Sequence, residues 1–528
     1  RYAVCLLDRN GLRPARWVLT KNNWITLASE VGTHSFKDED VLAKGRLGPG
    51  QIFAVDTKTG QLLKSDQIDA QLKSAHPYKK WLKQRGQRLS SALIDEKSSM
   101  YQIPAAEFQS YQKLFGVTFE ERDQIIRVLA ESGQEAVGSM GDDTPMAVLS
   151  SRPRQLTDYF RQQFAQVTNP PIDPLRESLV MSLETCVGPE RNLFTQQIDH
   201  ADRIILTTPV LSHSKFRNII SVVRQSMPVE RISLLYDQDL SLEFAINSVC
   251  DIAEQHVRDG RVILVFSDRG VKAGLLPIHG ALAIGAVHHR LVNKGLRCHS
   301  NLIIETGYAR DPHQFAVLVG VGATAIYPYL AYNVIEDLVR TGELVGDAIA
   351  AHRMFRKAIT KGLFKVLSKM GISTVASYRG SQLFEAIGLS KAVIALCFPG
   401  LPSRIAGATF EHIAHDQKIL ANAAWKSRKA IEQGGLLKYV HGQEYHAFNP
   451  DVVQSLIKAV KSGEYADYLD YANGVNDRSI ATLRDMLAIK YAKEPLDLEQ
   501  VEPIEAILQR FDSAGMSLGA LSPEAHEA

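Results

Sequence analysis

The 528-residue sequence predicts an α/β fold whose centre is built from repeated βα units. Short apolar runs recur between residues 200 and 330, and helical patterns lie between them. Their spacing of roughly 28 to 40 residues fits right-handed crossovers on a parallel sheet. A (β/α) barrel, or a piece of one, is therefore the leading architecture. A doubly wound open sheet is the alternative, because periodicity does not distinguish the two.

Each element of this central region has a local signal. The apolar runs predict strands at Arg203–Thr207, Arg231–Tyr236, Val262–Ser267, Leu302–Glu305 and Ala323–Tyr327. The intervening patterns predict helices at Leu240–Arg258, Ile278–Asn293 and Pro312–Val321. Asp311 followed by Pro312 is typical of a helix start, with a capping carboxylate and proline at the first helical position.

The first 70 or so residues indicate a β-rich region. Strands are expected at Tyr2–Leu7, Trp17–Thr20, Trp24–Ser29 and Gln51–Asp56. Polar helices then follow at Gln71–Lys83 and Ala105–Leu114. The Asp8–Pro14 stretch contains Asn10-Gly11, a pair that favours a hairpin turn.

Other segments are assigned from periodicity and caps. Phe119–Ala130 is an amphipathic helix, with Thr118 as its N-cap and Glu121 at capping-box spacing. The other expected elements are a helix at Gln155–Phe164, a rigid Pro-rich stretch at Asn169–Pro174, mainly helical segments at 335–390 and 408–500, a loop at Gly434–Pro450, and a first barrel strand at Met516–Leu521.

Composition excludes several classes of protein. Lys and Arg total 60 against 58 Asp and Glu, which gives no basic surface for nucleic acid or an anionic membrane. No apolar stretch is long enough for a spanning helix. The five cysteines are widely separated and have no metal-ligand spacing, so we expect no metal site in this chain. They indicate a reducing, cytoplasmic compartment.

Polar residues after two predicted strands are the candidates for chemistry. Asp268 and Glu305 occupy the place where barrels carry catalytic groups, but a salt bridge at the rim is the favoured interpretation. Gly138–Pro145 contains Asp142 and Asp143, for which an Asx turn is favoured over a divalent-metal site. The helical neighbours His288 and His289 point in different directions and are poorly placed to chelate one ion.

Four long segments resemble the large chain of the glutamate synthase family. They are residues 164–186 (FAQVTNPPIDPLRESLVMSLETC), residues 362–389 (GLFKVLSKMGISTVASYRGSQLFEAIGL), residues 141–150 (GDDTPMAVLS) and residues 511–528 (FDSAGMSLGALSPEAHEA). The resemblance covers essentially the whole sequence. It implies three parts: residues 1–115 as the β-rich end of a class II, Ntn-type amidotransferase domain, 116–395 as the central domain, a degenerate TIM-barrel-like α/β unit, and 396–528 as the start of a flavin-binding (β/α)8 barrel.

The resemblance also implies a reaction. The family releases ammonia from glutamine, passes it through an internal tunnel, adds it to 2-oxoglutarate and reduces the imine with electrons from FMN. Its electron donor is a small flavoprotein subunit or ferredoxin. The complete enzyme also carries a [3Fe-4S] cluster. A non-catalytic scaffold built from the same domains is the alternative function, and a barrel isomerase or lyase using Asp268 or Glu305 is a third.

The same resemblance assigns few functional residues to this chain. The family nucleophile is an N-terminal Cys, whereas this sequence begins at Arg1 and Cys5 lies within a predicted strand. We therefore expect no catalytic residue, no cofactor held by this fragment, and no activity from it alone. Met516, Ser517 and Gly519 are expected beside the flavin of the complete enzyme. Residues implied to line the ammonia tunnel are Met181, Ser182 and Thr208.

Gly307 also bears on cofactor binding. Residues 302–330 are similar to a later unit of the flavin barrel, in which a Gly-containing turn holds the flavin phosphate. Here Gly307 is followed by Tyr308, Arg310 and Asp311, without a Gly-rich turn. We expect the central domain to be a structural duplicate that binds no cofactor.

Overall fold

The computed structural model describes residues 1–8, 11, 13–89, 103–138, 142–163, 177–221, 227–426, 428–512, 515–517, 519 and 521–527. The chain divides into two compact units, Arg1–Ala481 and Thr482–Ala528, and each is described by itself. The predictions at Asn10 and for the Pro-rich 169–174 stretch lie outside the described residues. None of the helices in the described ranges is long and apolar enough to cross a lipid bilayer.

Two small antiparallel sheets form the beginning of the chain. The strands of the first are β1 (Tyr2–Leu6), β5 (Ile52–Asp56) and β6 (Gln61–Lys64), in the order β1-β5-β6; those of the second are β2 (Arg16–Thr20), β3 (Ile25–Ala28) and β4 (Val41–Arg46), in the order β3-β2-β4. Leu7, Leu47 and Phe53 make a small core, on which Trp17 stacks with its ring 5.5 Å from Phe53. The four predicted strands are confirmed, and β4 and β6 are additional.

The polar segment that follows forms two helices, whereas one was predicted over Gln71–Lys83. α1 covers Ser65–Ala75 and α2 covers Tyr78–Arg85. Pro77 lies between them; it lacks an N–H and restricts the preceding residue, so the helix does not continue. α3 spans Ala105–Leu114, as predicted.

A continuous helical stretch begins after Thr118. It comprises α4 (Phe119–Glu121), one π-helical turn (Arg122–Ile126) and α5 (Arg127–Ser132). Thr118 accepts a hydrogen bond from the Glu121 amide at 3.1 Å, which confirms the predicted N-cap. The side chain of Glu121 does not complete a capping box; it accepts a hydrogen bond from Arg310 instead.

The helix predicted at Gln155–Phe164 is wrong. Leu156–Tyr159 form a 3-10 turn, and β8 (Phe160–Gln162) pairs antiparallel with β17 (Phe384–Leu389). The Phe160 ring packs edge-on against Phe384 and Phe398, with ring centroids 6.0 and 5.1 Å away. Burial of this aromatic cluster outweighs the local helical pattern. The strand β17 also interrupts segment 335–390, which was expected to be mainly helical.

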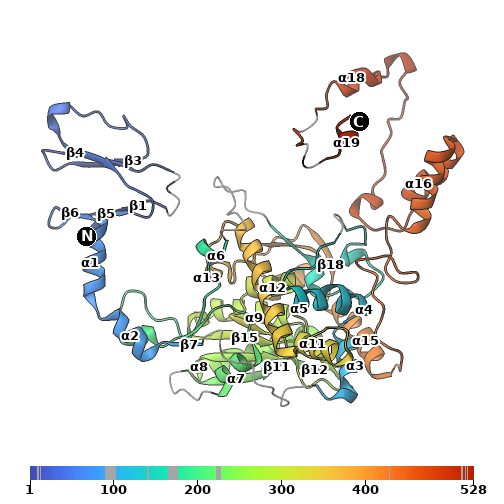
Figure 1. Ribbon diagram of the computed structural model, residues 1–528, viewed down its shortest axis with the longest axis horizontal. Helices are drawn as coiled ribbons and strands as arrows, with labels where there is room; N and C mark the ends of the chain where they lie inside the picture. The colour runs from blue at the N-terminus through green and yellow to red at the C-terminus, as the bar shows by residue number, and fades with distance from the viewer. Residues whose placement is uncertain are drawn as a thin grey trace. The chain divides into compact units, whose positions relative to one another are not determined.

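A four-stranded parallel sheet forms the centre of the first unit (Figure 1). Its strands, in the order β11-β13-β15-β16, are β11 (Val229–Ser233), β13 (Ile263–Ser267), β15 (Asn301–Glu305) and β16 (Ala325–Tyr327). Val210 extends the sheet through a parallel bridge to Ile326. Each crossover between neighbouring strands contains a helix, which confirms the α/β class and the predicted βα repeat.

The sheet is open in the part of the chain that the structure describes, and no closed barrel is formed there. The predicted strand Arg203–Thr207 exists as β10 (Ile204–Leu206) but belongs to a different sheet. It pairs with β7 (Gln87–Leu89) and β9 (Thr185–Val187). The predicted strand Arg231–Tyr236 is split between β11 and β12 (Leu235–Asp237), which pairs with β14 (Leu275–Pro277).

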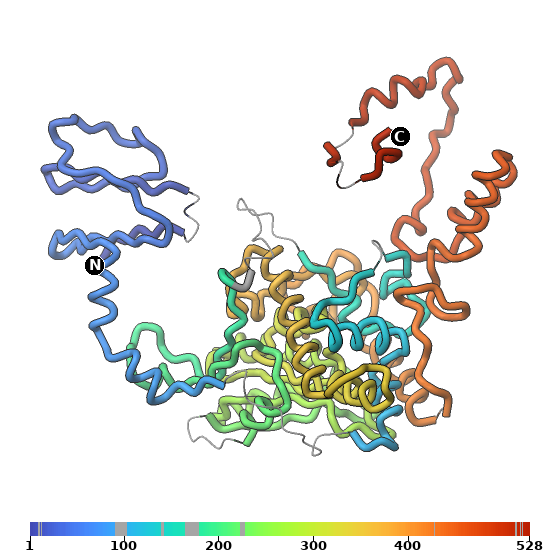
Figure 2. Tube along the Cα trace, in the orientation of Figure 1, coloured from blue at the N-terminus to red at the C-terminus, as the bar shows by residue number. Residues whose placement is uncertain are grey.

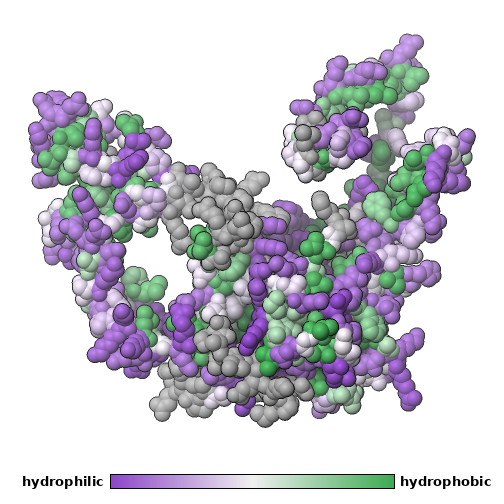
Figure 3. Space-filling model, viewed as in Figure 1, coloured by the Kyte–Doolittle hydropathy of each residue, from purple (hydrophilic) through white to green (hydrophobic). Residues whose placement is uncertain are grey.

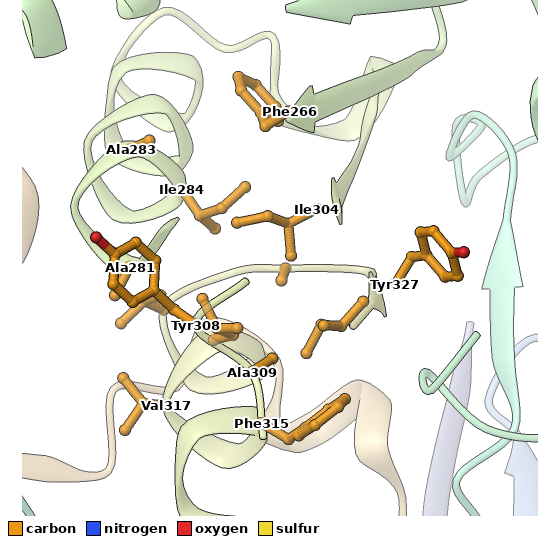
Figure 4. Packing of buried hydrophobic residues seen from close by; sticks show 14 of the residues in the cluster. Phe266, Ala281, Ala283, Ile284, Ile304, Tyr308, Ala309, Phe315, Val317 and Tyr327 are labelled. Carbon is orange, nitrogen blue, oxygen red and sulfur yellow. The ribbon is translucent and has the colours of Figure 1, made fainter. Parts of the chain in front are cut away.

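Helices pack around this sheet and on one another, and together they form a large apolar core. They are α7 (His213–Ser221), α8 (Leu242–Arg258), α9 (Gly280–Asn293), α10 (Pro312–Gly320), α11 (Tyr329–Thr341) and α12 (Ala348–Lys369), of which α12 packs on α10 and α11. The short helix α6 (Glu177–Val180) contacts α12. Figure 4 shows Ile284 of α9 close to Ile304 of β15. A Cβ at Gly280 would lie 2.2 Å from Cδ1 of Ile304, so a larger residue at 280 would require the Ile304 side chain to shift.

Segments distant in sequence also pack together, as the trace in Figure 2 shows for α3 and α15. Ser110 of α3 donates a hydrogen bond to the Ala424 carbonyl at 3.1 Å. The elements after α12 are α13 (Val375–Tyr378), β17, α14 (Lys391–Cys397), β18 (Ile405–Ala408), α15 (Phe410–Lys426), α16 (Pro450–Ser462) and α17 (Tyr465–Asn476). The predicted loop between α15 and α16 is confirmed, and α16 shows hydrophobic side chains at its surface (Figure 3).

The second unit contains little regular structure among its described residues. Its α-helices are α18 (Ile504–Leu508) and α19 (Pro523–Glu527), and 3-10 turns lie at Leu483–Met486 and Leu498–Gln500. The described residues of the range Met516–Leu521 form no strand: Met516 and Ser517 have no regular structure, and Gly519 lies in a turn; residues 518 and 520 lie outside the described residues. Both Met516 and Ser517 are exposed, so no burial stabilises a strand there.

Candidate functional site

Glu305, at the carboxyl end of β15, lies in a buried ionic cluster. Its carboxylate pairs with the guanidinium of Arg231 and lies 3.5 Å from that of Arg269. Ser267 of β13 donates a hydrogen bond to the same carboxylate at 2.6 Å. These partners confirm the predicted salt bridge at the rim of the sheet, and they leave Glu305 fully buried with its charge compensated.

Asp268 follows β13 and has a different environment. Its carboxyl accepts hydrogen bonds from the Thr306 hydroxyl at 2.5 Å and from the Gly307 amide at 3.1 Å. The side chain is fully buried, and this burial raises the pKa of Asp268 to about 7. Asp268 thus fixes the start of the loop that follows β15, and it was predicted to form a salt bridge rather than this hydrogen-bonded contact.

The loop after β15 contains Gly307, at the position where the similar unit of the flavin barrel would hold the flavin phosphate. A phosphate at such a loop needs free backbone N–H groups. Here the Gly307 amide donates to Asp268, Tyr308 to the Thr306 hydroxyl at 3.1 Å, and Arg310 to the Gln314 side chain at 2.7 Å. The ring of Phe115 occupies the space beside Gly307, only 2.8 Å from where a Cβ would lie. The loop therefore does not fit a phosphate group.

A buried ion pair joins this loop to the helical stretch after Thr118. Arg310 is fully buried; its Nε donates to Glu121 at 2.6 Å and its Nη1 donates to the Gly307 carbonyl at 2.6 Å. Sequence reasoning missed this pair, because the two residues are 189 positions apart and neither has a local signal for the other.

The residues expected to line an ammonia tunnel lie on two segments that border α12. Met181 is buried, whereas Ser182 is exposed and forms a parallel bridge with Thr374 just after α12. Thr208 is half-buried, with its hydroxyl 3.5 Å from that of Thr360 in α12.

Met516, Ser517 and Gly519 do not form an enclosed site within the second unit. All three are exposed, and the Ser517 carbonyl lies 3.4 Å from Nε2 of His526. Exposed backbone of this kind lacks the walls that would surround a flavin ring. The described residues of this unit do not by themselves fit FMN.

The remaining sequence candidates have structural roles. Asp142 accepts hydrogen bonds from the Thr144 amide at 3.0 Å and hydroxyl at 2.7 Å, which confirms the Asx turn; residues 139–141 lie outside the described residues. His288 accepts a hydrogen bond from Arg297 at 3.0 Å, and burial lowers its pKa to about 3. Across the described ranges, no group of three or more His, Cys, Asp or Glu side chains could hold a metal ion.

A cavity of about 1240 Å³ lies at the carboxyl edge of the sheet. The stretch after Thr118, the start of α10, α15 and the loop after α15 contribute its walls. Glu120 holds that loop in place: its carboxylate accepts hydrogen bonds from four consecutive backbone amides, Gly435 to Lys438, at 2.8 to 3.1 Å. Sequence reasoning missed this cavity, because its walls come from segments as far apart in the sequence as Lys113 and Glu444.

The sequence matches a family model that covers most of this central fold. The model describes the glutamate synthase central domain and matches residues 110–390. The chain belongs to the glutamate synthase family. Two further models match this glutamate synthase chain: class-II glutamine amidotransferases at residues 1–81, and a conserved region in glutamate synthase at residues 446–528. The resemblance read from the sequence is thereby confirmed.

Curated relatives match along nearly the whole chain. A glutamate synthase [NADPH] large chain from Bacillus subtilis is 38% identical over 99% of this chain and 34% of its own length. A ferredoxin-dependent glutamate synthase 2 from Synechocystis is 40% identical over 99% of this chain and 35% of its own length. A chloroplastic ferredoxin-dependent glutamate synthase from Oryza sativa is 39% identical over 99% of this chain and 33% of its own length. The chain spans about a third of the length of these relatives.

Proposed function

We propose that this chain is the part of a glutamate synthase that joins a glutamine-hydrolysing site to a synthase site and conveys ammonia between them. The observation that carries the proposal is the order of the three family matches: amidotransferase, central domain and synthase region follow one another along one polypeptide. The proposed parts are residues 1–115, 116–395 and 396–528.

The proposed reaction of the complete enzyme converts glutamine, 2-oxoglutarate and two electrons into two molecules of glutamate. Hydrolysis of glutamine gives one glutamate and ammonia; the ammonia forms an imine with 2-oxoglutarate, and two electrons with two protons reduce it. FMN and a [3Fe-4S] cluster would supply the redox chemistry, with Met516, Ser517 and Gly519 beside the flavin. The relatives are named for both NADPH and ferredoxin, so a small flavoprotein subunit and ferredoxin are both candidate donors.

We also propose a cytoplasmic location. All five cysteines are free thiols, a state that fits a reducing compartment. Some plant relatives are named as chloroplastic enzymes.

An ammonia path needs walls that exclude bulk water, because ammonia that reaches water is protonated and lost. We propose Met181, Ser182 and Thr208 as lining residues. The burial of Met181 and the partial burial of Thr208 against α12 support this role.

Replacement of Thr208 by Trp is expected to uncouple the two half-reactions in the complete enzyme. The bulky ring would fill the space beside α12, so glutamine hydrolysis would continue while glutamate formation from 2-oxoglutarate falls at least tenfold. The measurement is the ratio of glutamine consumed to 2-oxoglutarate consumed. Thr195→Trp is the matched control, because Thr195 is exposed. A ratio of one in the Thr208 variant would remove Thr208 from the path.

A further inference from the structure

Helix α16 has an apolar stripe that faces solvent. In an amphipathic helix of a folded protein, apolar side chains at positions i, i+3, i+4 and i+7 normally pack against a core. In α16 the residues with this spacing are between 41 and 76% exposed, and they contribute to the hydrophobic area on this helix in Figure 3: Val453, Leu456, Ile457 and Val460. The residues that the structure describes therefore leave this stripe uncovered.

Helix α17, which packs beside α16, adds a second stripe. Tyr465, Tyr468 and Leu469 have the spacing i, i+3, i+4 and are 70, 51 and 41% exposed. The ring centroids of the two tyrosines lie 5.8 Å apart. Tyrosine is enriched at the centre of contacts between protein surfaces, so this stripe has the composition of an interface.

The two helices are held in one arrangement before anything covers them. Asn449 caps α16 by accepting hydrogen bonds from two backbone amides of its first turn, at 3.1 and 3.2 Å. Lys458 of α16 pairs with Asp467 of α17 at 2.6 Å. Just before α16, the Phe448 amide donates a hydrogen bond to the carboxylate of Asp143 at 3.0 Å, which fixes this end of the hairpin to the first unit. A surface that is already ordered loses little entropy when a partner binds it.

The family matches indicate what covers the stripes. Both helices lie within residues 446–528, which match the conserved region in glutamate synthase, and outside residues 110–390, which match the central domain. The chain spans about a third of the length of its curated relatives. The proposed synthase site requires a flavin-binding barrel, and the described residues form no closed barrel. The body of that barrel therefore belongs to the remaining length of the complete polypeptide.

We propose that the two stripes of the α16–α17 hairpin are the docking surface for the part of the synthase region that lies beyond these 528 residues. This inference rests on the proposed function, in which the synthase site belongs to the same polypeptide. A segment of the same polypeptide has a high effective concentration, so it covers an apolar surface in preference to a second copy. The contact would attach the synthase region to the unit that contains the parallel sheet, through the end of the hairpin that Asp143 fixes.

Photo-cross-linking in the complete natural polypeptide tests this surface. The photoreactive residue p-benzoylphenylalanine replaces Val460 in one variant and Tyr468 in another, so each stripe carries one probe. Both side chains are exposed and Tyr468 is already aromatic, so we expect both variants to fold. Each should form a cross-link to residues of the same polypeptide that follow Ala528. The yield should be at least about ten times that of the control, because only a packed position has another segment within contact distance. The control carries the same replacement at Val345, a 94% exposed valine between α11 and α12.

Three results would overturn the proposal. A cross-linked product with the mass of two chains would assign the stripes to a second copy. Cross-links only to residues within 1–528 would assign them to a contact among these residues. The absence of a cross-link at both positions would mean that the stripes stay exposed to solvent in the complete enzyme.

Hydroxyl-radical footprinting of the unmodified enzyme gives the same comparison if a variant does not fold. Tyr468 should be oxidised about ten times more slowly than Phe194, which is 98% exposed, because a packed ring is shielded from solvent. Equal rates would also overturn the proposal. Transfer of amide nitrogen tests the proposed function separately, so an enzyme that conveys ammonia but lacks the cross-link would overturn this inference alone.

Discussion

Replacement of Arg310 by Met is expected to lower the free energy of unfolding by about 3–5 kcal/mol. The substitution leaves the carboxylate of Glu121 buried without the guanidinium that lies 2.6 Å away. It also removes the hydrogen bond to the Gly307 carbonyl, so the loop after β15 loses its tie to the stretch after Thr118. Urea denaturation, followed by tryptophan fluorescence, measures the change.

The double variant Arg310→Met with Glu121→Gln separates charge from packing. With an uncharged amide at residue 121, the double variant should recover most of the lost free energy of unfolding, because an unpaired buried charge is the costly state. Arg340→Met is the matched control: Arg340 pairs with Asp337 but its side chain is 74% exposed, and exposed pairs contribute about 0–1 kcal/mol. An Arg310 variant as stable as the Arg340 variant would contradict the role assigned to the buried pair.

Asp268→Asn is expected to change how stability depends on pH. The pKa of Asp268 is raised from 3.8 to about 7 in the folded protein, so between these values the folded state binds a proton that the unfolded state has released. The stability that this proton contributes is complete below pH 4 and is lost as the pH rises towards 7. A difference of about three pKa units corresponds to about 4 kcal/mol.

The measurement is the free energy of unfolding of wild type minus that of Asp268→Asn, from pH 4 to pH 8. This difference should fall with increasing pH, since the amide can accept the Thr306 and Gly307 hydrogen bonds but does not ionise. Asp259→Asn, at an exposed aspartate on the C-terminal side of α8, is the matched control and should show no such fall. A flat difference for Asp268→Asn would mean that the carboxylate is ionised throughout.

Local patterns predicted most of the individual elements. The period of apolar residues located α3, α8, α9 and α10, and the Asp311-Pro312 pair marked the start of α10. Strand pairing was less predictable, because it depends on partners far along the chain. β10 has the apolar composition of a central strand, yet it joins a sheet with β7 and β9, and β8 forms only because β17 is available to it.

The sites were less predictable than the fold. The rim position of Glu305 followed from its place after a strand, and its salt bridge was the favoured interpretation. The pair Arg310–Glu121 and the hydrogen bonds from the loop after α15 to Glu120 depend on segments that meet only in the folded chain. No sequence spacing encodes such contacts, and the roles of Thr208 and Met516 rest on family resemblance.

Transfer of labelled nitrogen tests the central claim, that this chain belongs to an enzyme that conveys ammonia internally. The complete natural enzyme is given glutamine labelled with ¹⁵N at its amide, ¹³C-labelled 2-oxoglutarate and an excess of unlabelled ammonium, and the ¹³C-glutamate is analysed by mass spectrometry. We expect nearly all of the ¹³C-glutamate to carry ¹⁵N. Dilution of the label to the level of ammonium in the bulk solution would contradict an internal path.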